Sequence, residues 1–151
     1  MMLEKRKRAA MTKVLIMEDS AMQALMLADW FELDGHETHV TNNAADALEC
    51  LLGTEQYDLL VTDVFGAGET GDATGAKLIE TIRDNPAARI RDMPIISISG
   101  LSFETKSHDA DQSSGSDGKA RTIASDVHFL KPIDVGQLSR TANELIAAAK
   151  G

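Results

Sequence analysis

The chain has 151 residues and an apolar fraction of 43%, which suits one folded domain and argues against disorder of the whole chain. It carries 24 acidic and 15 basic residues, so the net charge is −9, and we expect phosphate backbones of nucleic acids to repel it. No apolar run is long enough to span a bilayer, and no signal-peptide pattern opens the chain. We therefore expect a cytoplasmic protein with no membrane partner.

The first predicted elements follow a basic N-terminal extension, residues 1–11, which we expect to be solvated and flexible. Lys13 to Met17 is a continuous apolar run, typical of a strand that is covered on both faces. Ser20 can cap a helix that ends at Gly35. The apolar residues that recur at helical spacing in it are Met22, Leu25, Met26 and Leu33.

His36 to Val40 is a weaker second strand, and Asn42 or Asn43 can cap a second helix that Gly53 ends. Cys50 lies on the apolar stripe of that helix, and since it is the only cysteine we expect a buried, unreactive thiol in a reducing compartment. Tyr57 to Val64 is a strong third strand. A glycine-rich loop over Phe65 to Thr74 follows it.

Gly75 to Arg83 is the next predicted helix, and the region of Pro86 stops it. Pro94 to Ser99 and Val127 to Leu130 are the last two strands, and Gln137 to Ala149 is a final amphipathic helix. Between these strands, residues at about 107–118 are small and polar, so we expect a flexible loop insertion there.

Strands that alternate with helices predict one α/β domain, residues 12–150, with a parallel sheet and helices on both faces. In such sheets the chemistry lies beyond the carboxyl ends of the strands. The residues at those ends are Glu18, Asp19, Asp63, Ser99 and Lys131. Three clustered carboxylates call for a hard divalent cation such as Mg²⁺, while a hydroxyl and a lysine can bind phosphoryl oxygens. An aspartate in such a pocket can itself accept a phosphoryl group.

The segments KVLIMEDS, YDLLVTDV, PIISISG and HFLKPID resemble, in order, the signature stretches of response-regulator receiver domains in two-component and phosphorelay signalling. The resemblance implies a flavodoxin-like, doubly wound sheet of five strands in the order 2-1-3-4-5. It further implies that Asp63 is the phospho-acceptor of a bacterial phosphoprotein. The metal, Mg²⁺ or Mn²⁺, would be held by Glu18, Asp19, Asp63 and the backbone carbonyl of Phe65.

By the same resemblance, Ser99, Gly100 and Lys131 correspond to residues that surround the phosphoryl group, and Pro132 follows the lysine, often after a cis bond. His128 occupies the position of an aromatic switch residue, usually Tyr or Phe. The implied partners are a histidine kinase or histidine-phosphotransfer protein and a downstream protein target. Because no residue follows Gly151, we expect a stand-alone signalling switch and not an enzyme.

The residues also allow three alternative functions. Gly66, Gly68 and Gly71 spell the dinucleotide-binding pattern G-x-G-x-x-G, but the pattern follows the third strand instead of the first. A phosphoaspartate phosphatase of the haloacid-dehalogenase type needs a second aspartate where Phe65 stands. A degenerate receiver that binds partners without phosphorylation is the main alternative, and the intact acidic residues and lysine argue against it.

Overall fold

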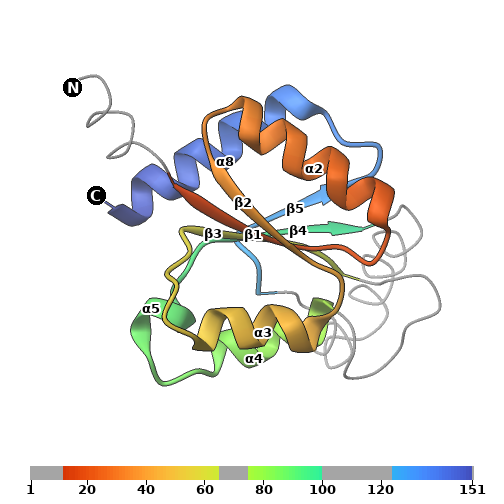
Figure 1. The fold of residues 1–151 in the computed structure, drawn as a ribbon. Helices are drawn as coiled ribbons and strands as arrows, with labels where there is room; N and C mark the ends of the chain where they lie inside the picture. The colour runs from red at the N-terminus through yellow and green to blue at the C-terminus, as the bar shows by residue number, and fades with distance from the viewer. Residues whose placement is uncertain (1–11, 65–74, 100–123, 151) are drawn as a thin grey trace, which may run out of the picture.

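The computed structural model describes residues 12–64, 75–99 and 124–150 (Figure 1). The predicted N-terminal extension, the glycine-rich loop and the polar insertion lie outside the described residues. The strands are β1 (Lys13–Met17), β2 (Glu37–Thr41), β3 (Leu59–Asp63), β4 (Ile95–Ser99) and β5 (Val127–Leu130). The helices are α2 (Ala21–Leu33), α3 (Ala44–Leu52), α4 (Gly75–Arg83), α5 (Ala88–Arg91) and α8 (Val135–Lys150).

The five strands form one sheet in the order β2-β1-β3-β4-β5, and every neighbouring pair is parallel. This arrangement confirms the predicted α/β class and the strand order that the resemblance implied. Because all strands run the same way, their carboxyl ends lie along one edge of the sheet (Figure 1). Glu18, Asp63 and Ser99 stand at or just beyond the ends of three strands that are adjacent in the sheet, namely β1, β3 and β4.

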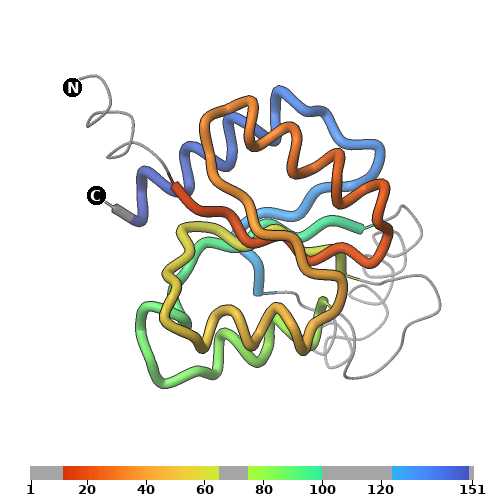
Figure 2. The backbone as a smooth tube through the Cα atoms, viewed as in Figure 1, coloured from red at the N-terminus to blue at the C-terminus, as the bar shows by residue number. Residues whose placement is uncertain are grey.

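Helices cover both faces of the sheet, with α2 and α8 on one side and α3, α4 and α5 on the other (Figure 2). Successive strand residues point to opposite faces, so each inner strand contributes side chains to the hydrophobic core on each side of the sheet. In β1, for example, Val14 and Ile16 pack with α2 and α8, whereas Leu15 and Met17 pack with α3 and α4. The strands β3 and β4 are buried at every position for the same reason.

The buried face of α2 differs from the predicted one. The buried residues are Ala24, Leu27, Ala28 and Phe31. Met22, Leu25, Met26 and Leu33, which we expected to face the core, are 73%, 65%, 44% and 86% exposed. Apolar side chains surround this helix on nearly all sides, so spacing alone does not select a face. The two alanines decide it, because small side chains let the helix approach the sheet closely.

Smaller differences have local causes. The strand β2 begins and ends one residue later than predicted, and α5 is a single turn that is too short to give a periodic signal. Cys50 is half-buried and not fully buried as predicted, because α3 places it beside the edge strand β2. Its Sγ lies 3.7 Å from His39 Nε2.

Candidate functional site

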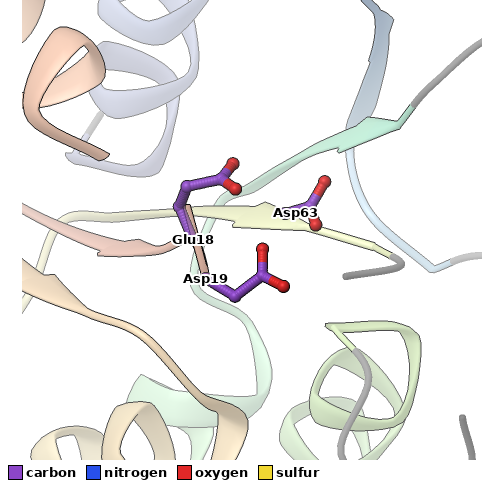
Figure 3. Close-up of side chains that lie close together, drawn as sticks. All are labelled: Glu18, Asp19 and Asp63. Atoms are coloured by element: carbon purple, nitrogen blue, oxygen red, sulfur yellow. The ribbon is translucent and has the colours of Figure 1, made fainter. Parts of the chain in front are cut away.

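Three carboxylates meet at the carboxyl edge of the sheet (Figure 3). Glu18 and Asp19 follow β1, and Asp63 ends the neighbouring strand β3. One oxygen from each of them lies within 4.8 Å of the others. Glu18 and Asp63 are only 2% and 6% exposed, whereas Asp19 is exposed to solvent. The sheet topology therefore gathers two buried carboxylates and one exposed carboxylate at the same edge.

The Glu18 carboxyl is buried beside a second buried carboxylate, that of Asp63. Its backbone N–H donates to the Thr41 carbonyl at 3.0 Å, which ties it to the end of β2, and the Ser20 N–H donates to its Oε2 at 3.2 Å. Burial, and next the charge of Asp63, raise the pKa of Glu18 from 4.5 to about 7, although the Ser20 N–H and Lys131 oppose this rise. Without a cation, the site therefore holds a proton on Glu18 over much of the acidic range.

Lys131 places its ammonium group beside the carboxylates. Its Nζ lies 3.5 Å from Asp63 Oδ1 and 4.0 Å from Glu18 Oε1, and it donates to Gln23 Oε1 at 2.7 Å. The Lys131 backbone N–H donates to the Ser99 carbonyl at 3.0 Å, and the bond from Lys131 to Pro132 is cis. Among the residues that the structure describes, the positive charge of Lys131 faces the three carboxylates, and a single charge does not balance them when all are ionised.

A serine and histidine network lies beside this group, at the end of β4. Ser99 is 1% exposed, and its Oγ lies 2.8 Å from His128 Nε2. His128 Nδ1 lies 2.6 Å from Ser97 Oγ, which in turn lies 2.7 Å from Ser125 Oγ. The imidazole on β5 therefore bridges two serines of β4, which differs from the exposed orientation that an edge-strand histidine could have adopted.

The backbone of Asp63 is enclosed by the start of α4. The Gly75 N–H donates to the Val64 carbonyl at 2.9 Å. A Cβ built on Gly75 would lie 1.9 Å from the Asp63 carbonyl oxygen and 2.7 Å from Thr62 Oγ1. Because real Cβ atoms do not approach backbone oxygens so closely, only glycine permits this packing.

The structure brings together the residues predicted from the strand ends, namely Glu18, Asp19, Asp63, Ser99 and Lys131, with His128 beside Ser99. Phe65 and Gly100 lie outside the described residues. Sequence reasoning missed Gln23 and Gly75. Gln23 stands three residues after the helix-capping Ser20, and this S-x-x-Q pattern was a usable signal that places it in the first turn above the strand ends.

The donor atoms suit a hard divalent cation. All three side chains offer carboxylate oxygens, which Mg²⁺ and Mn²⁺ prefer to nitrogen or sulfur. Oxygens around an octahedral Mg²⁺ are roughly 2.9 to 4.2 Å apart. The three carboxylate oxygens lie within 4.8 Å of one another, so small side-chain rotations or an intervening water would let them share one ion. A cation would also offset the burial of the Glu18 charge and its repulsion by Asp63, which together raise the pKa of Glu18.

Several solved structures of receiver domains have a fold similar to that of this chain. The receiver domain of a signal transduction histidine kinase from Syntrophus aciditrophicus has a TM-score of 0.72 and 24% identity, and the match covers 92% of each chain. A response regulator receiver protein from Pseudomonas putida has a TM-score of 0.66 and 25% identity, over 89% of this chain and 98% of that one. A chemotaxis response regulator of Vibrio cholerae has a TM-score of 0.66 and 19% identity, over 90% and 99% of the two chains.

The resemblance to response-regulator receiver domains is thus confirmed at the level of the fold. No protein-family model matches the sequence, and no curated protein matches it. Among the described residues, none of the helices combines the length and the apolar composition needed to cross a membrane.

Proposed function

We propose that this chain, which has the fold of response-regulator receiver domains, accepts a phosphoryl group on Asp63 and relays the change to a protein partner. One observation carries the proposal. The buried Asp63 carboxylate ends the central strand β3, with Lys131 Nζ 3.5 Å away and oxygens of Glu18 and Asp19 within 4.8 Å. The Lys131 ammonium offers a positive charge to phosphoryl oxygens, the three carboxylates could hold a cation that offers more, and a carboxylate can act as the nucleophile.

Each residue of the site has a separate role in the proposed phosphoryl transfer. An Asp63 oxygen attacks phosphorus, the bond from phosphorus to a donor histidine nitrogen breaks, and an aspartyl phosphate remains. Glu18, Asp19, Asp63 and, by resemblance, the Phe65 carbonyl would hold Mg²⁺ or Mn²⁺, which when bound offsets the charge of the carboxylates and of the phosphoryl oxygens. The Lys131 ammonium and the Ser99 hydroxyl would then contact phosphoryl oxygens. By resemblance, Gly100 would occupy the small-residue position beside them.

The proposed donor is a histidine kinase or a histidine-phosphotransfer protein, and the proposed recipient of the signal is another protein. Support for the donor class comes from the neighbour from Syntrophus aciditrophicus, which is the receiver domain of a histidine kinase. The Ser97–His128–Ser99 hydrogen bonds support a switch role for His128. If the Ser99 hydroxyl turns to a phosphoryl oxygen, His128 loses that partner, and the end of β5 can change position.

A small acyl phosphate with Mg²⁺ tests the proposal, with intact mass as the measurement. The wild type is expected to gain one phosphoryl mass that needs Mg²⁺, and Asp63→Asn to gain none. Asp29→Asn, which changes an exposed aspartate on α2, is the matched control and is expected to behave as the wild type. A wild type that binds Mg²⁺ but never gains the mass would instead favour a module that acts without phosphorylation.

A further inference from the structure

The Lys131 ammonium group lies between the first turn of α2 and the carboxylates of the acidic site. Its Nζ donates to Gln23 Oε1 at 2.7 Å, and it lies 3.5 Å from Asp63 Oδ1 and 4.0 Å from Glu18 Oε1. A hydrogen bond from N–H to oxygen is roughly 2.7 to 3.2 Å long, so both carboxylate distances exceed that range. The amide oxygen of Gln23 is therefore a closer partner of Lys131 than either of these carboxylates.

The chemistry of the lysine fixes which atom of the Gln23 amide faces it. An ammonium group only donates hydrogen bonds, so the amide must present its oxygen to Nζ and turn its N–H₂ group away. Because this oxygen belongs to a neutral group, the contact leaves the positive charge of Lys131 unbalanced by Gln23. That charge therefore still acts on the carboxylates.

Both ends of the contact are anchored by hydrogen bonds of backbone N–H groups. The Gln23 N–H donates to Ser20 Oγ at 3.3 Å in the first turn of α2, and the Ser20 N–H donates to Glu18 Oε2 at 3.2 Å. On the other side, the Lys131 N–H donates to the Ser99 carbonyl at 3.0 Å, which ties the residue after β5 to the end of β4. The turn that follows Glu18 thus also fixes the position from which Gln23 reaches Lys131.

Loss of the Gln23 oxygen would change the partner of Lys131. Asp63 is the nearer of the two carboxylates, and a shift of Nζ by about 0.7 Å would bring it within hydrogen-bond range. The lysine side chain is 31% exposed, so it has room for this shift. A hydrogen bond between an ammonium group and a carboxylate is roughly twice as strong as one between neutral groups. Lys131 would then compete for a carboxylate that the proposed metal and the proposed phosphoryl transfer both need.

We infer that Gln23 is a positioning residue for Lys131, a role that rests on the proposed phosphoryl transfer to Asp63. The amide oxygen holds the ammonium group near Asp63 but beyond the range of a direct hydrogen bond. Lys131 therefore offers its charge to phosphoryl oxygens and competes less for the Asp63 carboxylate. Gln23 contacts neither the phosphoryl group nor the metal in this role and acts through Lys131.

Calorimetric titration of the full chain with Mg²⁺ tests this role, with Gln23→Met as the first variant. Methionine keeps the length and the helix preference of glutamine but lacks the oxygen, and position 23 is exposed, so the fold is expected to persist. We expect the dissociation constant for Mg²⁺ to rise about fivefold, the effect of one hydrogen bond of ordinary strength.

Gln137→Met is the matched control. Gln137 is exposed and is the third residue of α8, as Gln23 is of α2, and its N–H likewise donates to a side chain before the helix, Asp134 Oδ1, at 3.0 Å. This substitution is expected to leave the dissociation constant within about twofold of the wild-type value. Far-ultraviolet circular dichroism confirms folding of each variant.

The same substitution in the Lys131→Met background shows whether Gln23 acts through the lysine. Without Lys131, Gln23→Met is expected to change the dissociation constant for Mg²⁺ by less than about twofold. Gln23→Glu restores an oxygen at the same reach and is expected to bind Mg²⁺ no more weakly than the wild type. Wild-type affinity in Gln23→Met, an equal loss in the Lys131→Met background, or a weaker affinity in Gln23→Glu would overturn the inference.

Intact mass after reaction with a small acyl phosphate separates this inference from the proposed function. If the wild type gains the phosphoryl mass while Gln23→Met keeps the wild-type affinity for Mg²⁺, only the role of Gln23 is wrong. If the wild type never gains the mass, the proposed function is wrong. A loss of Mg²⁺ affinity that depends on Lys131 would then support Gln23 as a positioning residue of a metal site alone.

Discussion

Replacing Glu18 by glutamine is expected to stabilise the metal-free protein above neutral pH. The Glu18 carboxyl is 2% exposed, and burial together with Asp63 raises its pKa from 4.5 to about 7. In acid, both the folded and the unfolded chain carry the proton, so the group contributes nothing. As the pH rises from 4.5 to 7, the unfolded chain loses the proton first, and the folded state becomes relatively less stable.

The magnitude follows from the two pKa values. One pKa unit corresponds to about 1.4 kcal/mol, so the ionised Glu18 costs the folded protein about 3 kcal/mol above pH 7. Glutamine has nearly the same shape, stays neutral, and can still accept from the Ser20 N–H. The difference in unfolding free energy between Glu18→Gln and wild type is therefore expected to be near zero at acidic pH and to grow to about 3 kcal/mol at pH 8.

Urea unfolding in the presence of a chelator, followed by fluorescence of the single tryptophan, Trp30, measures this difference across the pH range. Glu144→Gln, at an exposed position of α8, is the matched control and is expected to show no such trend. Added Mg²⁺ should stabilise the wild type by about 1.4 kcal/mol at ten times its dissociation constant, and Glu18→Gln by less. A stability difference that does not change with pH, or a variant less stable than wild type at pH 8, would refute the reasoning.

Further predictions concern the packing and charge around Asp63. Gly75→Ala is expected to cost about 3 kcal/mol in urea unfolding, because its Cβ would meet the Asp63 carbonyl, whereas Gly136→Ala should be neutral or stabilise by up to about 1 kcal/mol. Lys131→Met should tighten Mg²⁺ binding in calorimetry, since a competing cation 3.5 Å from Asp63 is removed, and a weaker affinity would contradict this. Phe31→Ala should cost about 3–5 kcal/mol without changing the slope against urea, and a loss below 1 kcal/mol would show that α2 is not anchored there.

The sequence predicted the sheet well because its physical signals are local. Continuous apolar runs such as Lys13 to Met17 indicate strands with two covered faces, and the polar residues that follow them must share one edge. Asp63 and Lys131 were found in this way, although they are 68 positions apart and meet only through the sheet.

What the sequence did not predict depends on packing between elements. The face of α2 was wrong because Met22 and Leu25 are as apolar as Leu27 and Phe31, and only the fit of Ala24 and Ala28 to the sheet distinguishes them. The role of Gly75 follows from a close approach that no pattern encodes. The contact of Cys50 with His39 needs the relative position of α3 and β2, which the apolar stripe of a helix does not give.

The most direct test of the central claim is to locate the phosphoryl group on one atom. After reaction with a small acyl phosphate and Mg²⁺, borohydride reduces an aspartyl phosphate to homoserine, and peptide mass spectrometry identifies the reduced residue. We predict homoserine in place of Asp63, at no other aspartate, and only when Mg²⁺ is present. A phosphoryl group found on Ser99 or on a histidine, or reduction at another carboxylate, would contradict the account.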